Sequence, residues 1–287
     1  MVIEKEEAMS DTQKVPMEQH IAEIWTSTKM AEHWQRGAEQ RKQVMAAATE
    51  RLIDLAALQP GDHVLDIAAG TGDQGRLAAK RVGPTGLVLI TDISAQMLAI
   101  AARLAEQEGL SAVQTRVMNA EQLELEENSF DAVICRHGLE AVPRLQQALG
   151  EIRRVLKPGK RFVVLTWSLP ERNPLIHFFA KSSVQFAQKR SSSVPTPFAF
   201  SERPVLEREF REAGFQEVFT EVLPLCFRYP SLEAFLQSSQ GEMRPGPKKS
   251  AEELQQRLEE MRSIFEPYEG PNGLEIPGEA LLGVAVK

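Results

Sequence analysis

The segment Val64–Asp73, with the sequence VLDIAAGTGD, constrains the fold more than any other part of the chain. A short apolar run leads into two glycines, which is typical of a buried parallel strand that turns into a helix. Gly70 and Gly72 let the backbone adopt open dihedral angles and approach a ligand closely. The segment therefore predicts a strand-to-helix turn that binds a nucleotide-type cofactor.

Strand and helix patterns alternate after this turn, which predicts an α/β fold with a doubly wound, Rossmann-like sheet and right-handed crossovers. Helices are expected near 73–82, 94–108 and 144–156. The expected strands are Val64–Ala68, Leu87–Asp92, Val113–Met118, Asp131–Cys135, Arg161–Trp167, Glu217–Phe227 and Ala280–Val286. The sheet is thus expected to have seven strands and to be mostly parallel.

The chain divides into four expected regions. Residues 1–16 have the composition of a flexible tail, and 17–57 have helical periodicity with a break at Gly37. Residues 58–167 form the cofactor-binding core. Residues 168–287 complete the same domain with a helical insertion after the fifth strand and two final strands. A Ser250–Glu253 capping box opens a helix between those strands.

Composition excludes several classes of function. The net charge is −7 and the basic residues are dispersed, so a nucleic-acid partner is not expected. Cys135 and Cys226 are the only cysteines, so the sequence predicts neither a metal site nor a disulfide framework. Two separate cysteines fit a reduced, cytoplasmic setting. No apolar run is long enough to span a membrane. We expect a cytoplasmic monomer or homodimer that acts on a small molecule.

Two cofactors compete for the glycine loop. Residues 70–75 also satisfy the dinucleotide fingerprint G-x-G-x-x-G, so an NAD-dependent reductase is an alternative. Asp66 favours S-adenosylmethionine, because a carboxylate suits a methionyl ammonium and disfavours a pyrophosphate. Asp92, at the end of the next strand, suits the ribose hydroxyls of either cofactor.

Five motifs decide between the cofactors by resemblance. VLDIAAGTGD, LITDIS, RVMNAEQL, FDAVICRHGL and IRRVLKPGKRFVV, in this order, resemble class I methyltransferases of the ubiquinone/menaquinone C-methyltransferase type. The resemblance covers about residues 60–167 and, more loosely, the flanking segments. It implies S-adenosylmethionine as cofactor, S-adenosylhomocysteine as product, and an N-terminal helical lid over the site. A scaffold that binds the cofactor without turnover stays an alternative.

The resemblance also implies which residues form the cofactor site. Around the methionine end and the sulfonium we expect Asp66, Ala68, Gly70, Thr71, Gly72, Cys135 and Arg136. Around the ribose and adenine we expect Asp92, Ile93, Met97, Asn119 and Ala120. Asn119 stands where the family has an acidic residue, so it keeps an acceptor atom but loses the charge. Thr71 either binds the cofactor carboxylate or packs, and Asp73 is expected to cap the following helix.

His137 is the candidate catalytic residue. It follows the fourth strand, and an imidazole can accept a proton near neutral pH, although the position can equally form a wall of the acceptor pocket. Trp34, Phe198 and Phe200 are expected to line the pocket or to pack in the core. Together with Phe178, Phe179 and Phe227, these aromatic residues indicate an apolar acceptor such as a phenol, a quinol, a polyketide or a terpenoid. O-methylation is favoured over C- or N-methylation if His137 is the base.

Overall fold

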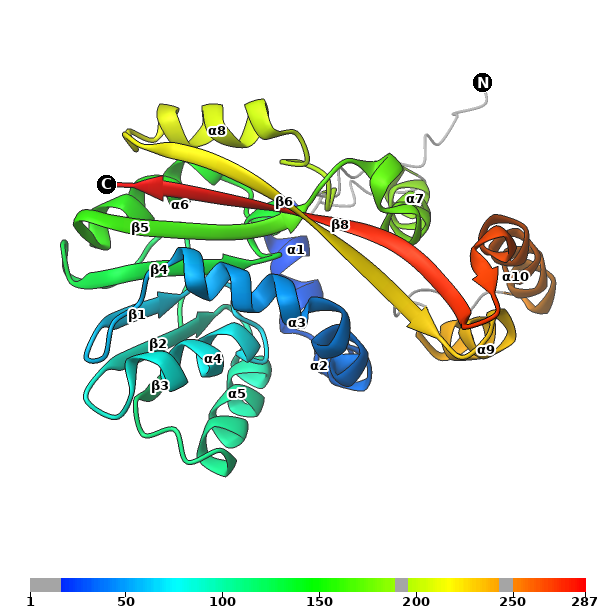
Figure 1. The fold of residues 1–287 in the computed structure, drawn as a ribbon, viewed down its shortest axis with the longest axis horizontal. Coiled ribbons are helices and arrows are strands. Elements are labelled where there is room, and N and C mark those ends of the chain that lie inside the picture. The colour runs from blue at the N-terminus through cyan, green and yellow to red at the C-terminus, as the bar shows by residue number, and fades with distance from the viewer. Residues whose placement is uncertain (1–16, 189–195, 243–249) are drawn as a thin grey trace, which may run out of the picture.

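The computed structural model describes residues 17–188, 196–242 and 250–287. The predicted tail, residues 1–16, lies outside the described residues. The protein has an α/β fold, in which a mixed β-sheet runs through the centre with helices on both faces (Figure 1).

The sheet has the strand order β3-β2-β1-β4-β5-β8-β6, and β8 alone runs antiparallel to its neighbours. The short β7 pairs with the first residues of β8. The predicted mostly parallel, Rossmann-like sheet is confirmed. The strands are β1 His63–Asp66, β2 Leu87–Asp92, β3 Val113–Val117, β4 Phe130–Arg136, β5 Leu156–Trp167, β6 Val218–Tyr229, β7 Glu269–Gly270 and β8 Gly273–Val286.

The helices begin and end where the sequence provides caps. Ser94 caps α5, and Ser250 forms the predicted capping box with Glu253. The N-terminal helices break at Gly37 as expected and also at Ser27. The helices are α1 Met17–Thr26, α2 Thr28–Arg36, α3 Ala38–Leu55, α4 Asp73–Val82, α5 Ala95–Gln107, α6 Leu145–Val155, α7 Pro174–Gln188, α8 Arg203–Glu212, α9 Leu232–Glu242 and α10 Ala251–Phe265, with short 3₁₀ turns η1 Leu139–Ala141, η2 Pro170–Arg172 and η3 Glu266–Tyr268.

The expected capping role of Asp73 is wrong. Gly72 occupies the N-cap of α4, and its backbone conformation is left-handed. Asp73 is the first helical residue, where its carboxylate forms ion pairs with Arg76 and Arg136 instead. A carboxylate in the first turn still interacts favourably with the positive end of the helix dipole.

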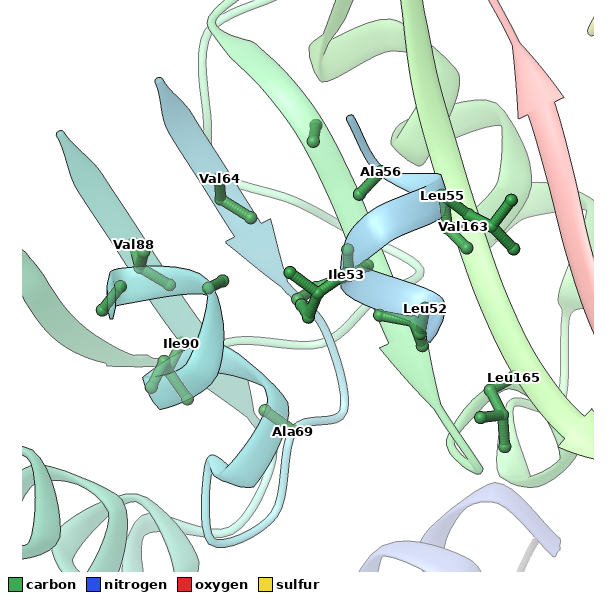
Figure 2. Packing of buried hydrophobic residues seen from close by; sticks show 14 of the residues in the cluster. Leu52, Ile53, Leu55, Ala56, Val64, Ala69, Val88, Ile90, Val163 and Leu165 are labelled. Atoms are coloured by element: carbon green, nitrogen blue, oxygen red, sulfur yellow. The ribbon is translucent and has the colours of Figure 1, made fainter. Parts of the chain in front are cut away.

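The core lies on both faces of the sheet because successive strand residues point to opposite sides. In β4, Ile134 packs in the cluster beneath α3 and α4, whereas Val133 packs in the cluster beneath α6 and α8. Figure 2 shows Leu52 and Ile53 of α3 facing the strands that carry Val64 and Val163. Burying each such side chain contributes about 1.5–3 kcal/mol, so these faces fix the strand ends that form the site.

The long strands β6 and β8 extend beyond the main sheet to a third apolar cluster (Figure 1). Phe178 of α7, Phe235 of α9, and Met261 and Phe265 of α10 pack there. Met261 and Phe265 belong to the helix that the Ser250–Glu253 capping box predicted, and both are buried. The predicted insertion after the fifth strand contains α7 and α8, while α9 and α10 lie between β6 and β8.

Candidate functional site

The glycine loop follows β1 and presents an incompletely satisfied carboxylate. Gly70 and Gly72 have φ angles of +56° and +73°, a left-handed conformation that favours glycine. Asp66, fully buried at the end of β1, accepts a hydrogen bond at its Oδ1 from Gln74 Nε2 at 2.9 Å. Its Oδ2 has no hydrogen-bond partner among the described residues. A Cβ on Gly75 would lie 2.7 Å from this oxygen, so the glycine allows α4 to approach β1.

The environment of Asp66 fits a cationic ligand group. Burial raises the pKa of this carboxyl to about 8, although Gln74 and Arg136 oppose the shift. A positive group beside the loop would stabilise the ionised form and give the buried oxygen a partner. The methionyl ammonium of S-adenosylmethionine is such a group, so the residues present fit this cofactor.

Asp92 connects the glycine loop to the start of α5. Its Oδ2 accepts a hydrogen bond from the Gly70 amide at 2.8 Å, and its Oδ1 accepts one from the Ser94 amide at 2.8 Å. Burial raises the pKa of Asp92, while these backbone donors oppose the shift. Each carboxylate oxygen keeps a further lone pair, so Asp92 can also accept hydrogen bonds from two ribose hydroxyls. The link between Asp92 and Gly70 is not apparent from the sequence, because 22 residues separate them.

Of the residues expected around adenine, Met97 packs against the N-terminal helices. Met97 is 2% exposed and packs with Met30 of α2, and the ring of Trp34 packs against the same cluster. Ala120 is buried and Ile93 is half-buried. Asn119 is exposed, and its side-chain oxygen accepts a hydrogen bond from the Glu121 amide at 2.9 Å. The acceptor atom that the sequence offered for adenine thus already accepts one hydrogen bond within its own turn and keeps one lone pair.

Arg136 joins three elements at the end of β4. It donates hydrogen bonds to Thr49 Oγ1 on α3 at 2.9 Å and to Asp73 Oδ2 on α4 at 3.0 Å. Burial disfavours the charge of Asp73, but Arg136 and Arg76 outweigh it and hold the pKa of Asp73 below its ordinary value. Arg76 also donates to the Thr71 carbonyl at 2.7 Å, which fixes the glycine loop. The network therefore links the glycine loop, β4 and α3.

His137 lies directly after β4 in a constrained position. Its φ is +54°, a left-handed conformation that is uncommon outside glycine and concentrates at functional sites. The imidazole stacks on Trp167 with a centroid distance of 4.3 Å, and its Nδ1 is 3.6 Å from Glu140 Oε1. Burial lowers the pKa of His137, whereas Glu140 opposes the shift. Cys135 beside it is fully buried, and burial raises its pKa, so its thiol packs in the core.

The helix α2 lies against the glycine loop through Trp34. A Cβ on Gly70 would be 3.6 Å from the indole Nε1 of Trp34. The Arg41 guanidinium lies 4.2 Å from the centre of the Trp34 ring and donates a hydrogen bond to the Trp34 carbonyl. Phe198 is half-buried with its ring 6.0 Å from that of His177, and Phe200 packs on the core beneath α8. The pocket-lining role of the two phenylalanines stays a prediction.

Comparison with known proteins identifies the family. The sequence model of the ubiE/COQ5 methyltransferase family matches residues 42–192, just over half of the chain. The chain belongs to this family. It is 32% identical to a demethylmenaquinone methyltransferase of Symbiobacterium thermophilum, over 72% of this chain and 89% of the relative. It is 44% identical to a ubiquinone/menaquinone C-methyltransferase UbiE of Ectopseudomonas mendocina, over 43% of this chain and 48% of the relative.

Solved structures show that this member of the ubiE/COQ5 family shares its fold with other methyltransferases. The YcgJ protein of Bacillus subtilis is similar with a TM-score of 0.59 and 21% identity, over 84% of this chain and 98% of that one. Phosphoethanolamine N-methyltransferase 2 of Haemonchus contortus, crystallised with S-adenosylhomocysteine, has a TM-score of 0.59 and 18% identity, over 93% of this chain and 60% of that one. At these identities the similarity shows the fold alone.

Family membership decides the cofactor. The chain is an S-adenosylmethionine-dependent methyltransferase, and the alternative of an NAD-dependent reductase is not favoured. In the three described ranges, no group of His, Cys, Asp or Glu side chains is arranged to hold a metal ion. None of the helices described is long and apolar enough to cross a membrane.

Proposed function

We propose that this methyltransferase acts on a small aromatic compound that carries a hydroxyl group, of the phenol or quinol class. The observation that carries the proposal is the stack of His137 on Trp167 at 4.3 Å, beside the ends of β4 and β5. This stack combines a flat apolar surface with a group that accepts a proton. Such a surface suits an aromatic ring whose hydroxyl must lose its proton as the methyl group is transferred.

The cofactor in this proposal lies along the ends of β1, β2 and β4. Asp66 and the glycine loop bind its methionine end, and Asp92 binds the ribose. The helices α1 to α3 form the lid, with Trp34 above the loop. The electron-rich acceptor atom forms a bond to the methyl carbon while the carbon–sulfur bond breaks. Because the positive charge on sulfur disappears, the protein mainly aligns the reactants and excludes water.

Carbon is the proposed methylated atom, since the similar proteins are named for C-methylation and for demethylmenaquinone. The O-methylation expected from the sequence is not confirmed. Deprotonating a phenolic hydroxyl makes the neighbouring ring carbon electron-rich, so a base at His137 serves C-methylation as well as O-methylation. O-methylation of the same class of acceptor is the second candidate, because it requires the same proton transfer.

Methyl labelling tests the proposal. Purified protein is given S-adenosylmethionine with a deuterated methyl group and three acceptors: a short-chain demethylmenaquinol, a simple phenol and an aliphatic amine. Mass spectrometry detects the product, and NMR locates the label. We expect the label on a ring carbon of the quinol. A label on oxygen selects the second candidate, whereas turnover of the amine without the quinol or phenol overturns the proposal.

A further inference from the structure

We propose that Glu140 is a positioning residue for His137. Its carboxylate holds the imidazole with the proton on Nδ1, so that Nε2 is free to accept a proton from the methyl acceptor. The inference rests on the proposed function, because it assigns the proton transfer in that reaction to a pair of residues.

Glu140 is a buried carboxylate with one oxygen in use. Its side chain is 8% exposed, and its Oε1 accepts a hydrogen bond from Thr166 Oγ1 on β5 at 2.5 Å. The other oxygen, Oε2, and both ring nitrogens of His137 have no hydrogen-bond partner within the described part of the chain. Buried polar atoms in native proteins are nearly always paired, so these three atoms indicate a site for a further polar group.

The backbone brings Glu140 back to the imidazole. His137 adopts its left-handed conformation, and Gly138 then passes so close to Ala68 that a Cβ there would lie 2.4 Å from the Ala68 Cβ. The turn η1 begins at the next residue and places the Glu140 Oε1 3.6 Å from the His137 Nδ1. Hydrogen bonds between catalytic groups are often this long without ligands and shorten when the substrate binds.

The charges around His137 define what Glu140 does. Arg136 on β4 disfavours a positive imidazole, and Glu140 on η1 favours it. Glu140 and Asp66 on β1 both act on the thiol of Cys135, the residue two before His137 on β4. Glu140 is therefore the anion that offsets burial and Arg136, so removing its charge lowers the pKa of His137 further.

The proposed step is balanced. A bond forms between the acceptor atom and the methyl carbon, and the carbon–sulfur bond breaks with its electron pair remaining on sulfur. The hydroxyl proton passes to Nε2 of His137, which becomes an imidazolium stabilised by Glu140. With a ring carbon as acceptor atom, the methylated ring is at first a ketone; that carbon then loses its own proton to solvent as the ring becomes aromatic again, and the imidazolium returns a proton to the oxygen. With oxygen as acceptor atom, the imidazolium releases its proton to solvent.

The test compares Glu140→Gln with Glu140→Asp and with Asp131→Asn as a matched control. Asp131 is a carboxylate at the opposite end of β4, paired with Lys157 and Lys160. The first readout is kcat against pH, with short-chain demethylmenaquinol as acceptor and S-adenosylmethionine saturating. The second is an NMR titration of the His137 ring in protein without cofactor, which reports the tautomer and the pKa. The second readout needs no turnover.

For Glu140→Gln we expect kcat to fall by ~10-fold or more. This loss is a part of the ~10²–10⁴-fold that general-base catalysis contributes, because His137 itself remains. The acid limb of the profile and the NMR pKa of His137 should both move to lower pH, and Nδ1 should lose its proton preference. Glu140→Asp should restore part of kcat, and Asp131→Asn should change neither readout.

A His137 titration and tautomer unchanged in Glu140→Gln would overturn the inference. If that variant does not fold, the same titration is made with Glu140→Asp, whose shorter side chain moves the carboxylate away from Nδ1 while keeping its charge. A weaker preference of the proton for Nδ1 supports the inference, and an unchanged tautomer overturns it. Failure of the wild-type protein to methylate any phenol or quinol rejects the proposed function instead, and the NMR readout keeps the two outcomes distinct.

Discussion

Replacing Asp66 by asparagine should remove a pH-dependent loss of stability from the cofactor-free protein. Burial raises the pKa of Asp66 to about 8 in the folded state, whereas an unfolded aspartate has a pKa of ~3.9. Between these values the folded state retains a proton that the unfolded state has lost. Because the unfolded state binds fewer protons, the free energy of unfolding decreases as the pH rises from about 4 towards 8.

The magnitude follows from this proton difference. One proton changes the free energy of unfolding by ~1.36 kcal/mol per pH unit, or ~2.7 kcal/mol between pH 5 and pH 7. The pKa of about 8 already includes the opposing effects of Gln74 and Arg136, so ~2.7 kcal/mol is the difference expected over this range. Burial lowers the pKa of His137, which has the opposite effect on stability in this range, so the comparison with Asp66→Asn isolates the aspartate.

Urea unfolding at pH 5, 6 and 7 measures this difference. The wild-type free energy of unfolding should decrease relative to that of Asp66→Asn as the pH rises. Asp131→Asn is the control, because Lys157, the His63 amide and Lys160 together outweigh burial and lower the pKa of Asp131, which places its titration below this window. Parallel pH dependence in wild type and Asp66→Asn would refute the assignment of a proton to Asp66. Calorimetry at pH 7 adds a second check: S-adenosylmethionine should displace a proton from wild type and none from Asp66→Asn.

Three further substitutions test the rest of the site. Asp92→Ala should weaken S-adenosylmethionine binding by ~1–3 kcal/mol without loss of fold, as followed by calorimetry and circular dichroism, and an unchanged affinity would remove Asp92 from the site. His137→Ala should lower kcat ~10²–10⁴-fold at nearly constant cofactor affinity, whereas a loss below about threefold would leave His137 as a pocket wall. Gly138→Ala should destabilise the protein by ~1–3 kcal/mol in thermal unfolding, because its Cβ would meet Ala68 at 2.4 Å. Gly150→Ala on α6 is its control, since a Cβ there meets nothing within 4 Å; equal stability of the two variants would contradict the packing argument.

The central strands of the sheet could be predicted because each is a short, buried apolar run with turn residues on both sides. The strand Leu87–Asp92 and the helix 73–82 have the predicted bounds, since a continuous apolar run between turn residues admits few other structures. β5 and β8 are longer than predicted. β8 begins at Gly273 instead of Ala280, and its first residues contain glutamate, proline and glycine, which hide the strand pattern. Pairing with β6 along its whole length holds that segment as a strand.

The cofactor side of the site was predictable to the extent that it is continuous in sequence. Asp66, Gly70 and Gly72 belong to one motif, so their proximity follows from a single turn. The contacts of Arg136 were not predictable, because its partners Thr49 and Asp73 lie 87 and 63 residues away. No periodicity or spacing connects such residues, and only the order of the strands brings them together.

The acceptor side differs because its defining feature is conformational. Ala68 and His137 follow the paired strands β1 and β4, and both have left-handed φ angles, of +48° and +54°. Each such angle costs roughly 1–2 kcal/mol for a residue with a side chain, so the packing around Gly138 must hold both. Glycine at these positions would make the turns recognisable in the sequence, as it does at Gly70. With alanine and histidine there, the sequence shows the cofactor loop clearly but gives no sign of the turn that directs His137 towards Glu140. The contact that orients the proposed proton acceptor is therefore visible only in the structure.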